Sequence, residues 1–473
     1  MKSVSKIVNM GFGTLFLFAV LYSIVELYHV FDERFKYTFF TIIFVIVMSV
    51  LICYVLYRTE KILTLNEKLC SRLLYILPVF LLAAQIAFAV LVDFTPKNDL
   101  SYICKGAENY IKYGIENLHD GLPEFHQNYF YVYPNNHLLF LIIAGVYKIS
   151  YAFTGEISNT LPTILNILAL NLSYIFMILT AKQFYTPAKA CICAIRGLMF
   201  TPLITYATLF YTDSLAMPFV SAGIYLYVRC RKENNIKKSF ILLIVCSIIS
   251  ALGYKMKGSV IILLIAIICD LFLHKYSVKS IMTKIITILT VFAVIVSILS
   301  AVSLKVLCTS TEEMKKYEFP IIHWIMMSAD GKGGYNYEDF SYTKSFEGYD
   351  NKITADKERL NKKLHDQGLS GFSEHLLNKI GYTWHDGTYM TSYYNPDNEF
   401  LNGNVFLIIA EILHVSILLE IVQGYIGKRK DDNDAACGNF FLKICLAGLF
   451  VFLLIWEARC RYLISFMPLF ALI

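Results

Sequence analysis

The chain has 473 residues, of which 57% are hydrophobic and 16% charged, and its mean hydropathy is +0.55. Soluble domains average about 25% charged and roughly 45–50% apolar residues, so the composition excludes an ordinary soluble protein. The net charge of +6 lies mainly in short loops between apolar runs, which indicates membrane orientation and not a nucleic-acid-binding surface. We therefore expect an all-α polytopic membrane protein that binds membrane lipid and no nucleic acid.

The first apolar run follows a short basic start that contains Lys2 and Lys6. This start is typical of a signal peptide, but the apolar stretch is too long and no small-residue cleavage site follows. We therefore expect a retained first helix over residues 8–31, followed by spans over 37–57 and 73–93. Several of the apolar runs in the chain exceed the roughly 20 residues that cross a bilayer.

Loops rich in lysine and arginine usually mark the cytoplasmic side of a membrane protein. This rule predicts a cell-membrane protein with both termini in the cytoplasm. It also predicts two external loop regions, 94–136 and 308–402. The basic loops are Arg58 to Arg72, Arg229 to Lys238, Lys275 to Lys284, and Gly427 to Lys430.

The remaining apolar runs complete one transmembrane domain over residues 1–473. N-terminal spans lie over 8–93, central spans over 137–307 and C-terminal spans over 403–473. The stretch 137–210 shows three apolar segments, although its two flanks need to lie on the same side. Either one segment is re-entrant or one splits into two short helices. We expect a helical bundle of about 12–14 transmembrane helices.

Several carboxylates lie where predicted spans meet the external side. Asp93 and Asp99 follow the outer end of the third span, and Asp213 lies at the outer start of a later span. Aspartate is a good N-cap, so Asp99 could simply cap a helix that starts near Leu100, and Asp213 could cap its own helix. A functional interpretation requires partners of opposite charge.

Cations occupy the same predicted side. Lys255 and Lys257 lie in a tight turn on the side that basic residues usually avoid, which favours an anionic ligand such as a lipid phosphate. Snorkelling to lipid headgroups is the alternative. Glu457, Arg459 and Arg461 lie at the outer ends of the last two spans. Glu457 could pair with an arginine, and arginine is also well suited to bind a phosphate.

Carboxylates and cations on one face are what glycosyl transfer from a lipid-phosphate sugar requires. A carboxylate accepts the proton of an attacking hydroxyl, and cations stabilise the departing phosphate. A transporter or flippase of a lipid-linked sugar is the alternative. Transporters place charged residues near the middle of the membrane, and the sequence shows few there.

The order of these motifs resembles the GT-C superfamily of integral membrane glycosyltransferases, which includes the protein O-mannosyltransferases and the aminoarabinose transferases. The segment "TPKNDLSYICKGAENYIKYG", followed by "YVYPNNHLL", resembles the first external loop of that family with its acidic residue. The segments "LFYTDSLAMPF" and "RCRYLISFMP" resemble the second external loop and the end of such chains. The segment "FPIIHWIMMSADGKGGYNYEDF" resembles an external loop of Gram-positive members.

This resemblance implies a GT-C-like fold, a polyprenyl-phosphate-linked sugar donor, an extracytoplasmic acceptor and an inverting single displacement. It implies Asp99 as the base, with Asp93 as the alternative, Asp213 as a supporting acid and Arg461 as a phosphate contact. The other substrate-binding residues implied by the motifs are Tyr133, Asn135, Asn136, His137, Lys255, Lys257, His323, Trp324, Arg459 and Tyr462.

Two departures from the family pattern matter. An extra hairpin, 8–57, precedes the usual first span, and the paired acids of the mannosyltransferases are not adjacent here, since Asp93 and Asp99 are six residues apart. External carboxylates would offer oxygen ligands to Mg²⁺ or Mn²⁺, but nothing in the sequence requires a metal, and the metal ligands stay unknown. The 12 cysteines show no metal spacing, and pairing of Cys104 with Cys308 is left open.

Overall fold

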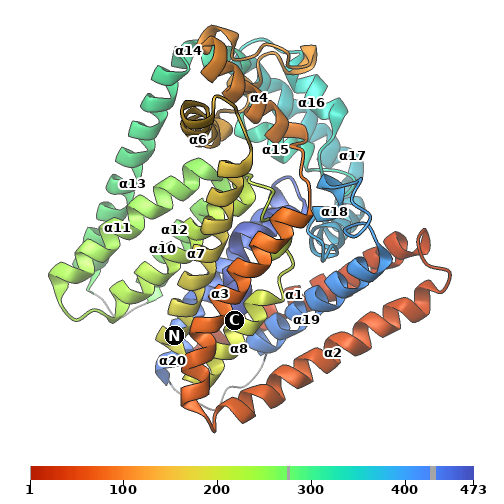
Figure 1. Cartoon of the computed structure of the whole chain (residues 1–473), viewed down its shortest axis with the longest axis vertical. Coiled ribbons are helices and arrows are strands. Elements are labelled where there is room, and N and C mark those ends of the chain that lie inside the picture. The colour runs from red at the N-terminus through yellow and green to blue at the C-terminus, as the bar shows by residue number, and fades with distance from the viewer. Residues whose placement is uncertain (1, 274–276, 427–432) are drawn as a thin grey trace.

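The fold was analysed in a computed structural model that describes residues 2–273, 277–426 and 433–473. In these ranges every regular element is a helix, which confirms the predicted all-α class (Figure 1). The predicted basic loop at Gly427–Lys430 lies outside the described residues.

Three long helices form the N-terminal part: α1 (Lys2–Asp32), α2 (Thr38–Leu63) and α3 (Glu67–Leu91). The side chain of Asn66 accepts a hydrogen bond from the backbone N–H of Leu69 at 3.0 Å, which is the N-cap that starts α3. These helices confirm the three predicted N-terminal spans.

The central part forms the main bundle, in which α10 packs against α7 and α11. The predicted segment 187–210 is broken between α8 and α9, in agreement with two short helices and not with one span. Pro187 and Pro202 each lie in the first turn of these helices, where the missing N–H costs nothing. The helices are α6 (His137–Thr154), α7 (Thr160–Phe184), α8 (Pro187–Leu198), α9 (Pro202–Thr205), α10 (Thr212–Lys232), α11 (Ile236–Met256), η4 (Gly258–Val260), α12 (Ile261–Leu273) and α13 (Val278–Val306).

The C-terminal part returns to the middle of the bundle. It consists of α19 (Asn404–Ile426), α20 (Asn433–Ile455), the 3₁₀ helix η5 (Cys460–Phe466) and α21 (Met467–Leu472). The helix η5 packs on α10, and α21 packs on α7 and α8. The last residues of the chain are therefore part of the protein core.

The described residues contain 8 helices that are long and apolar enough to cross a membrane, with three shorter apolar stretches besides. This number is below the predicted 12–14, and the difference lies in the short helices. The helix α8 has only 12 residues, and α10 ends in Arg229, Arg231 and Lys232. Hydropathy alone does not show where an apolar run is broken.

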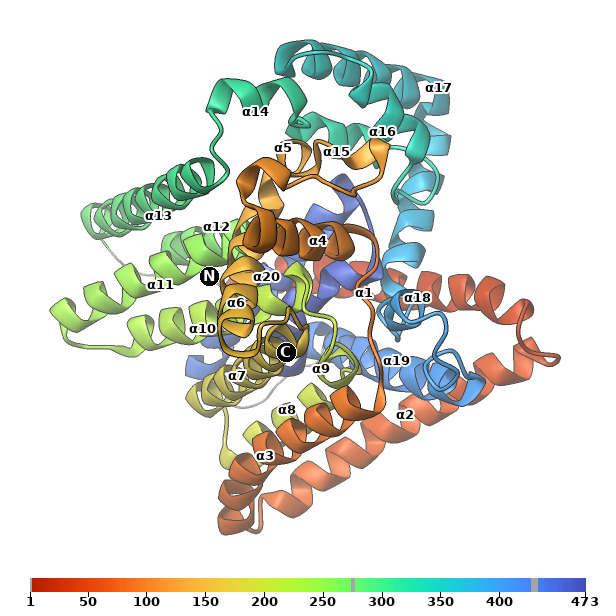
Figure 2. The same cartoon turned by 45° about the horizontal axis from the view of Figure 1, so that its top comes forward.

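The two predicted external regions lie together at one end of the bundle, which we call the loop face (Figure 2). The basic loops between α2 and α3 and between α10 and α11 lie away from it (Figure 1). Both regions are largely helical. Their elements are α4 (Asn98–Tyr113), η1 (Ile115–Asn117), η2 (Glu124–His126), α5 (Tyr129–Val132), η3 (Pro134–Asn136), α14 (Thr311–Tyr317), α15 (Ile321–Met327), α16 (Tyr337–Lys344), α17 (Tyr349–Trp384) and α18 (Thr391–Tyr394).

The long helix α17 joins the loop face to the bundle. It is kinked at Gly368, whose φ of 60° favours glycine, and its second half packs along α1. Trp384 at its end is buried, with its ring centroid 5.4 Å from that of Phe16 and 5.7 Å from that of Phe450. Residues 308–402 are therefore not a free loop, because their second half reaches into the apolar core.

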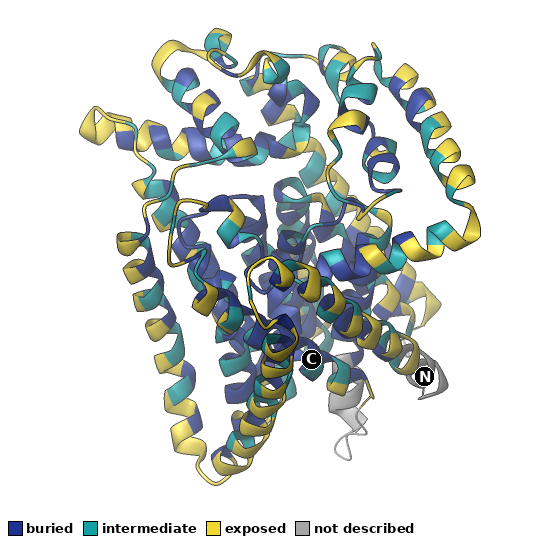
Figure 3. Cartoon of the chain, turned by 90° about the vertical axis from the view of Figure 1, so that its right-hand side faces the viewer, coloured by how far each residue is buried: buried dark blue, intermediate teal, exposed yellow. Residues whose placement is uncertain are grey.

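Burial is concentrated in the middle of the bundle, whereas the outer helices are exposed (Figure 3). Only 6% of the apolar window of α13 and 22% of that of α2 is buried inside the protein. Apolar helices that are this exposed require lipid around them. Cys104 and Cys308 are free thiols, the first buried and the second exposed, so they form no disulfide.

Candidate functional site

Three charged residues from distant parts of the chain meet at the loop face. Asp213 is in the first turn of α10, Lys257 follows α11, and Arg461 lies in η5. Lys257 forms an ion pair with Oδ1 of Asp213, and Arg461 Nη1 lies 3.6 Å from Oδ2 of the same carboxylate. Asp213 is 1% exposed and Arg461 7%. Two cations face one carboxylate, so this group, which we call the cation cluster, carries a net positive charge.

Tyrosine rings enclose the guanidinium group of Arg461. Its central carbon lies 5.1 Å from the ring centroid of Tyr211, 5.7 Å from that of Tyr394 and 5.3 Å from that of Tyr462. Nη1 also donates a hydrogen bond of 2.6 Å to the Tyr394 hydroxyl. Cation–π contacts of this kind hold a buried arginine without neutralising its charge. In the described part of the chain, Nε of Arg461 is buried and has no hydrogen-bond partner.

Tyr211 links Asp99 to the cation cluster. Its hydroxyl donates a hydrogen bond of 3.2 Å to Oδ2 of Asp99, while its ring packs against Arg461. Asp99 lies in the first turn of α4 and is partly exposed. Neither predicted cap is formed, since the N-cap residues are Lys97 for α4 and Tyr211 for α10. Asp99 and Asp213 are therefore placed for interactions other than capping.

A second ion pair borders the cation cluster. Arg459 Nε lies 2.8 Å from Oε1 of Glu457, and the Tyr462 hydroxyl donates to Oε2 at 2.9 Å. This confirms the simple alternative for Glu457, which pairs with an arginine. Arg459 is therefore already neutralised, in contrast to Arg461.

A row of aromatic residues packs at the loop face, next to the pair of Glu457 and Arg459. The ring of Tyr133 lies 6.1 Å from that of Trp324, which in turn stacks on Trp456 at 6.3 Å. Burial, together with the nearby charge of Asp99, raises the pKa of Tyr335 to about 12. Burial and then Asp99 also raise the pKa of Tyr133 well above its usual value. These phenols stay neutral and can serve only as hydrogen-bonding groups.

The turn before α6 has a local role. The Asn136 side chain donates to the Tyr129 hydroxyl at 2.7 Å, and His137 Nε2 lies 2.7 Å from the carbonyl oxygen of Phe130. Within the described residues, the Asn135 side chain donates to the side chain of its neighbour Asn136, at 3.4 Å, and to no other group. These contacts hold α5 against α6, and ligand binding by Asn135, Asn136 and His137 stays a prediction.

Three other predicted residues, His323, Asp93 and Lys255, lie outside the cluster. His323 is buried and hydrogen-bonded through Nδ1 to Thr343 at 2.7 Å, and burial lowers its pKa to about 3. It is therefore a neutral residue inside the α15–α17 packing. Asp93 is exposed and makes no hydrogen bond or ion pair within the described ranges. Lys255 bonds Ser300 of α13 at 3.2 Å.

Sequence reasoning missed the tyrosines that organise the cluster. Tyr211, Tyr335 and Tyr394 are three of 33 tyrosines, and no pattern distinguishes them from tyrosines that only pack. It also missed Lys379, whose ammonium group donates to the Ser328 carbonyl at 3.2 Å. Burial lowers the pKa of Lys379 to about 7. A lysine in an otherwise helical polar segment gave no sign of this burial.

The arrangement does not suit a divalent cation. Among the residues that the structure describes, no three His, Cys, Asp or Glu side chains gather in a way that could hold a metal ion. Asp213 is already paired with Lys257 and Arg461, and these two positive charges would repel a divalent cation at the same carboxylate. We therefore assign no residue to Mg²⁺ or Mn²⁺.

Together, the fold and the site define a helical polytopic membrane protein with a buried, positively charged cluster at one end of its bundle. The chain belongs to the family described as conserved hypothetical integral membrane protein, whose sequence profile matches residues 1–401. The matched region contains Asp99, Asp213 and Lys257, and it ends before η5, which carries Arg461. No curated protein matches the chain.

Proposed function

We propose that this chain is a glycosyltransferase of the GT-C type. It would move a sugar from a polyprenyl-phosphate donor to an acceptor on the extracytoplasmic side of the cell membrane. The observation that carries the proposal is the position of Asp99, a carboxylate with one partly exposed side, one tyrosine away from the positively charged cation cluster. The motifs that resemble the GT-C family lie in α4, α10 and η5, more than a hundred residues apart in the sequence. Their charged residues Asp99, Asp213 and Arg461 nevertheless belong to one contact network.

The proposed roles follow from the contacts. The acceptor hydroxyl attacks the anomeric carbon and gives its proton to Asp99, while the bond between that carbon and the phosphate oxygen breaks. The phosphate leaves with the electron pair and gains charge, which Arg461 and Lys257 stabilise. Nε of Arg461, buried and without a hydrogen-bond partner in the described residues, offers a donor to such an anion. Asp213 orients both cations, and Asp93, which is exposed and takes part in none of these contacts, is the weaker candidate for the base.

The proposal includes a membrane orientation. The loop face would be external and both termini cytoplasmic, because the basic loops between α2 and α3 and between α10 and α11 lie away from the loop face (Figure 1). In this orientation the exposed apolar surface of α13 and α2 lies in the lipid, where a polyprenyl chain also resides.

The test is donor turnover by the purified protein. The full chain, reconstituted in lipid nanodiscs, is incubated with radiolabelled polyprenyl-phosphate sugars and a glycan extract of the cells that make it. The proposal expects release of polyprenyl phosphate together with label in the acceptor. Label that only crosses the bilayer of proteoliposomes, without bond cleavage, would contradict the proposal and favour transport.

One observation favours the second candidate, a transporter or flippase of a lipid-linked sugar. The span α19 carries three buried ionisable residues, which sequence reasoning overlooked. Glu411 Oε1 accepts the N–H of Gly387 at 2.8 Å, His414 bonds the Tyr389 hydroxyl at 2.8 Å, and Glu420 pairs with Arg196. Buried ionisable residues within a span often mark a transport path. Loss of sugar-lipid movement in Glu411→Gln, with no chemical turnover by the unaltered protein, would support this candidate.

A further inference from the structure

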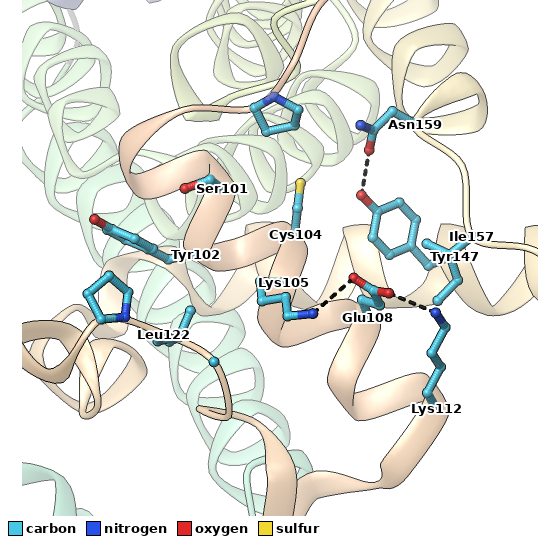
Figure 4. Close-up of a pocket in the computed structure, with 13 residues that line it drawn as sticks. Ser101, Tyr102, Cys104, Lys105, Glu108, Lys112, Leu122, Tyr147, Ile157 and Asn159 are labelled. Carbon is cyan, nitrogen blue, oxygen red and sulfur yellow. Dashed lines mark hydrogen bonds and ion pairs between the residues drawn. The ribbon is translucent and has the colours of Figure 1, made fainter.

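A groove of about 470 Å³ opens beside α4 at the loop face (Figure 4). Its volume falls within the roughly 300–1,000 Å³ that small-molecule sites occupy. The helix α4 forms one wall, and the chain around Leu122 forms another. Tyr147 of α6 and Asn159, just before α7, lie on the far side. None of the residues of the cation cluster lines this groove, so it is a separate feature of the same face.

The α4 wall is charged but nearly balanced. Glu108 lies between two lysines, with its carboxylate 2.7 Å from Lys112 Nζ and 3.6 Å from Lys105 Nζ. These residues are one turn apart on α4 and therefore share one side of the helix. The hydrogen bond from Lys112, more than the partial burial, sets the pKa of Glu108, which is lowered, so the carboxylate stays charged. The wall therefore offers one carboxylate as an acceptor and two ammonium groups as donors, with a net charge of +1.

The rest of the groove adds an amide and an aromatic ring. The Tyr147 hydroxyl donates to Oδ1 of Asn159 at 2.5 Å, which fixes the amide and leaves its nitrogen as a donor. The ring of Tyr102 lines the groove and packs on His126, with 4.5 Å between the centroids. A fixed phenol ring beside amide and carboxylate groups suits a pyranose. The ring of Tyr102 can cover the apolar face of the sugar, and the polar groups can bind the sugar hydroxyls.

Asp99 lies on the same helix as the groove wall and is linked through Tyr211 to the cation cluster. Tyr102 follows Asp99 by three residues on α4, so the two side chains lie on the same side of the helix. Partial burial and then the charge of Asp99 raise the pKa of Tyr102, as expected for close neighbours. Asp99 also accepts the hydrogen bond from Tyr211. Tyr102 therefore belongs both to the groove and to the surroundings of Asp99.

We propose that the groove beside α4 binds the terminal sugar of a glycan acceptor, with Tyr102 under the sugar ring and Glu108 and Asn159 at its hydroxyls. This inference rests on the proposed function, because it gives the groove the acceptor of that reaction. A peptide acceptor would require backbone pairing along an extended edge or apolar side-chain pockets. The groove instead offers charged and hydroxyl-binding groups.

Photo-crosslinking in living cells tests the occupant directly. Benzoylphenylalanine is placed at Lys105 in the groove, and at the exposed Lys315 of α14 as the matched control. After illumination, the proposal expects a carbohydrate adduct at position 105, which periodate destroys, and none at position 315. A periodate-resistant protein adduct at position 105, equal adducts at both positions, or no adduct at either would overturn the proposal.

Acceptor kinetics separate this inference from the proposed function. Loss of one hydrogen bond in Asn159→Ala should raise the acceptor KM by about tenfold, and Lys315→Ala should leave it unchanged. Glu108→Gln serves as a second variant if Asn159→Ala does not fold. An unaltered protein that turns over no donor would refute the proposed function, whatever the cross-links show. An active protein whose acceptor KM is the same in both groove variants would refute the groove assignment alone.

Discussion

The Tyr211 hydroxyl donates a hydrogen bond of 3.2 Å to Asp99, and the ring centroid of Tyr211 lies 5.1 Å from the guanidinium carbon of Arg461. The side chain of Tyr211, the N-cap residue of α10, thus lies between a carboxylate of α4 and a cation of η5. A single displacement needs this kind of separation, because the base and the leaving group lie on opposite sides of the carbon under attack.

The two candidate bases differ in their surroundings, which makes them a matched pair. Asp99→Asn keeps the shape of the side chain and removes its basicity, so we expect sugar transfer to fall by about 100-fold or more. Asp93→Asn changes an exposed residue and should leave the rate within about twofold of the unaltered protein. Transfer from a labelled donor, at equal protein levels, is the measurement. An inactive Asp93→Asn with an active Asp99→Asn would move the base to Asp93.

Arg461 should act on the donor. Arg461→Ala removes the buried guanidinium group, and we expect a rise in donor KM together with a fall in kcat, because the phosphate gains charge in the transition state. Arg461→Lys should rescue the activity only in part, since lysine lacks the planar fork. Arg459→Ala is the control, because Arg459 is paired with Glu457 at 2.8 Å. Equal donor kinetics in Arg461→Ala and the unaltered protein would exclude the phosphate contact.

The balance of charge in the cation cluster predicts an order of stabilities. Asp213→Asn leaves Lys257 and Arg461 buried without their common counter-charge, and loss of one partner of a buried pair typically costs about 3–5 kcal/mol. Adding Lys257→Met removes one of the two opposing cations, so the double variant should be more stable than Asp213→Asn alone. Thermal unfolding in one detergent is the measurement. A double variant that melts below Asp213→Asn would show that the cations do not repel each other there.

The sequence was sufficient to predict most of the membrane-spanning helices, because a long apolar run is enough to identify a span. The helix α13 illustrates this, since it is a run of 29 residues with a mean hydropathy of 2.8 in its apolar window. The break between α8 and α9 was visible only as an odd number of segments. The sequence does not show whether one segment is re-entrant or splits into two short helices. The surroundings of α8 and α10 include α21 and η5, which are more than two hundred positions away in the sequence.

The site was predictable as far as charge at the ends of spans reveals it. Asp213, Lys257 and Arg461 stood out because ionisable residues are rare in such surroundings. Glu411 should have stood out for the same reason and was overlooked within its apolar run. His323 was predicted from its neighbours in sequence, but its hydrogen bond to Thr343 comes from packing between α15 and α16, which no linear motif contains.

The buried carboxyl of Asp356 makes stability depend on pH. Burial raises its pKa from 3.8 to about 6, against the hydrogen bond from Thr343. The folded state therefore holds a proton more tightly than the unfolded state. The contribution is complete below about pH 4 and is lost as pH rises to about 6, with about 1.4 kcal/mol for each unit of pKa difference. Relative to Asp356→Asn, the unaltered protein should gain melting temperature between pH 7 and pH 4.5. The exposed Asp350→Asn is the control, and its melting temperature should change with pH as that of the unaltered protein does. If the melting temperature of Asp356→Asn also followed the unaltered protein across this pH range, the assignment to Asp356 would be contradicted.

Membrane topology is the condition on which the proposed site depends, because the proposed acceptor is extracytoplasmic. The structure places Asp99, Asp213 and Arg461 in one contact network, so they share one side of the membrane whatever its orientation. The basic loop between α10 and α11 predicts that this side is external.

Single cysteines at the exposed Lys315 and Glu347 of the loop face should react with a membrane-impermeant maleimide in intact cells, and one at the exposed Asn234 should react only after lysis. Three native cysteines are first replaced by serine: Cys269, Cys308 and Cys437. The reverse pattern would place the cation cluster in the cytoplasm, where the proposed acceptor is absent.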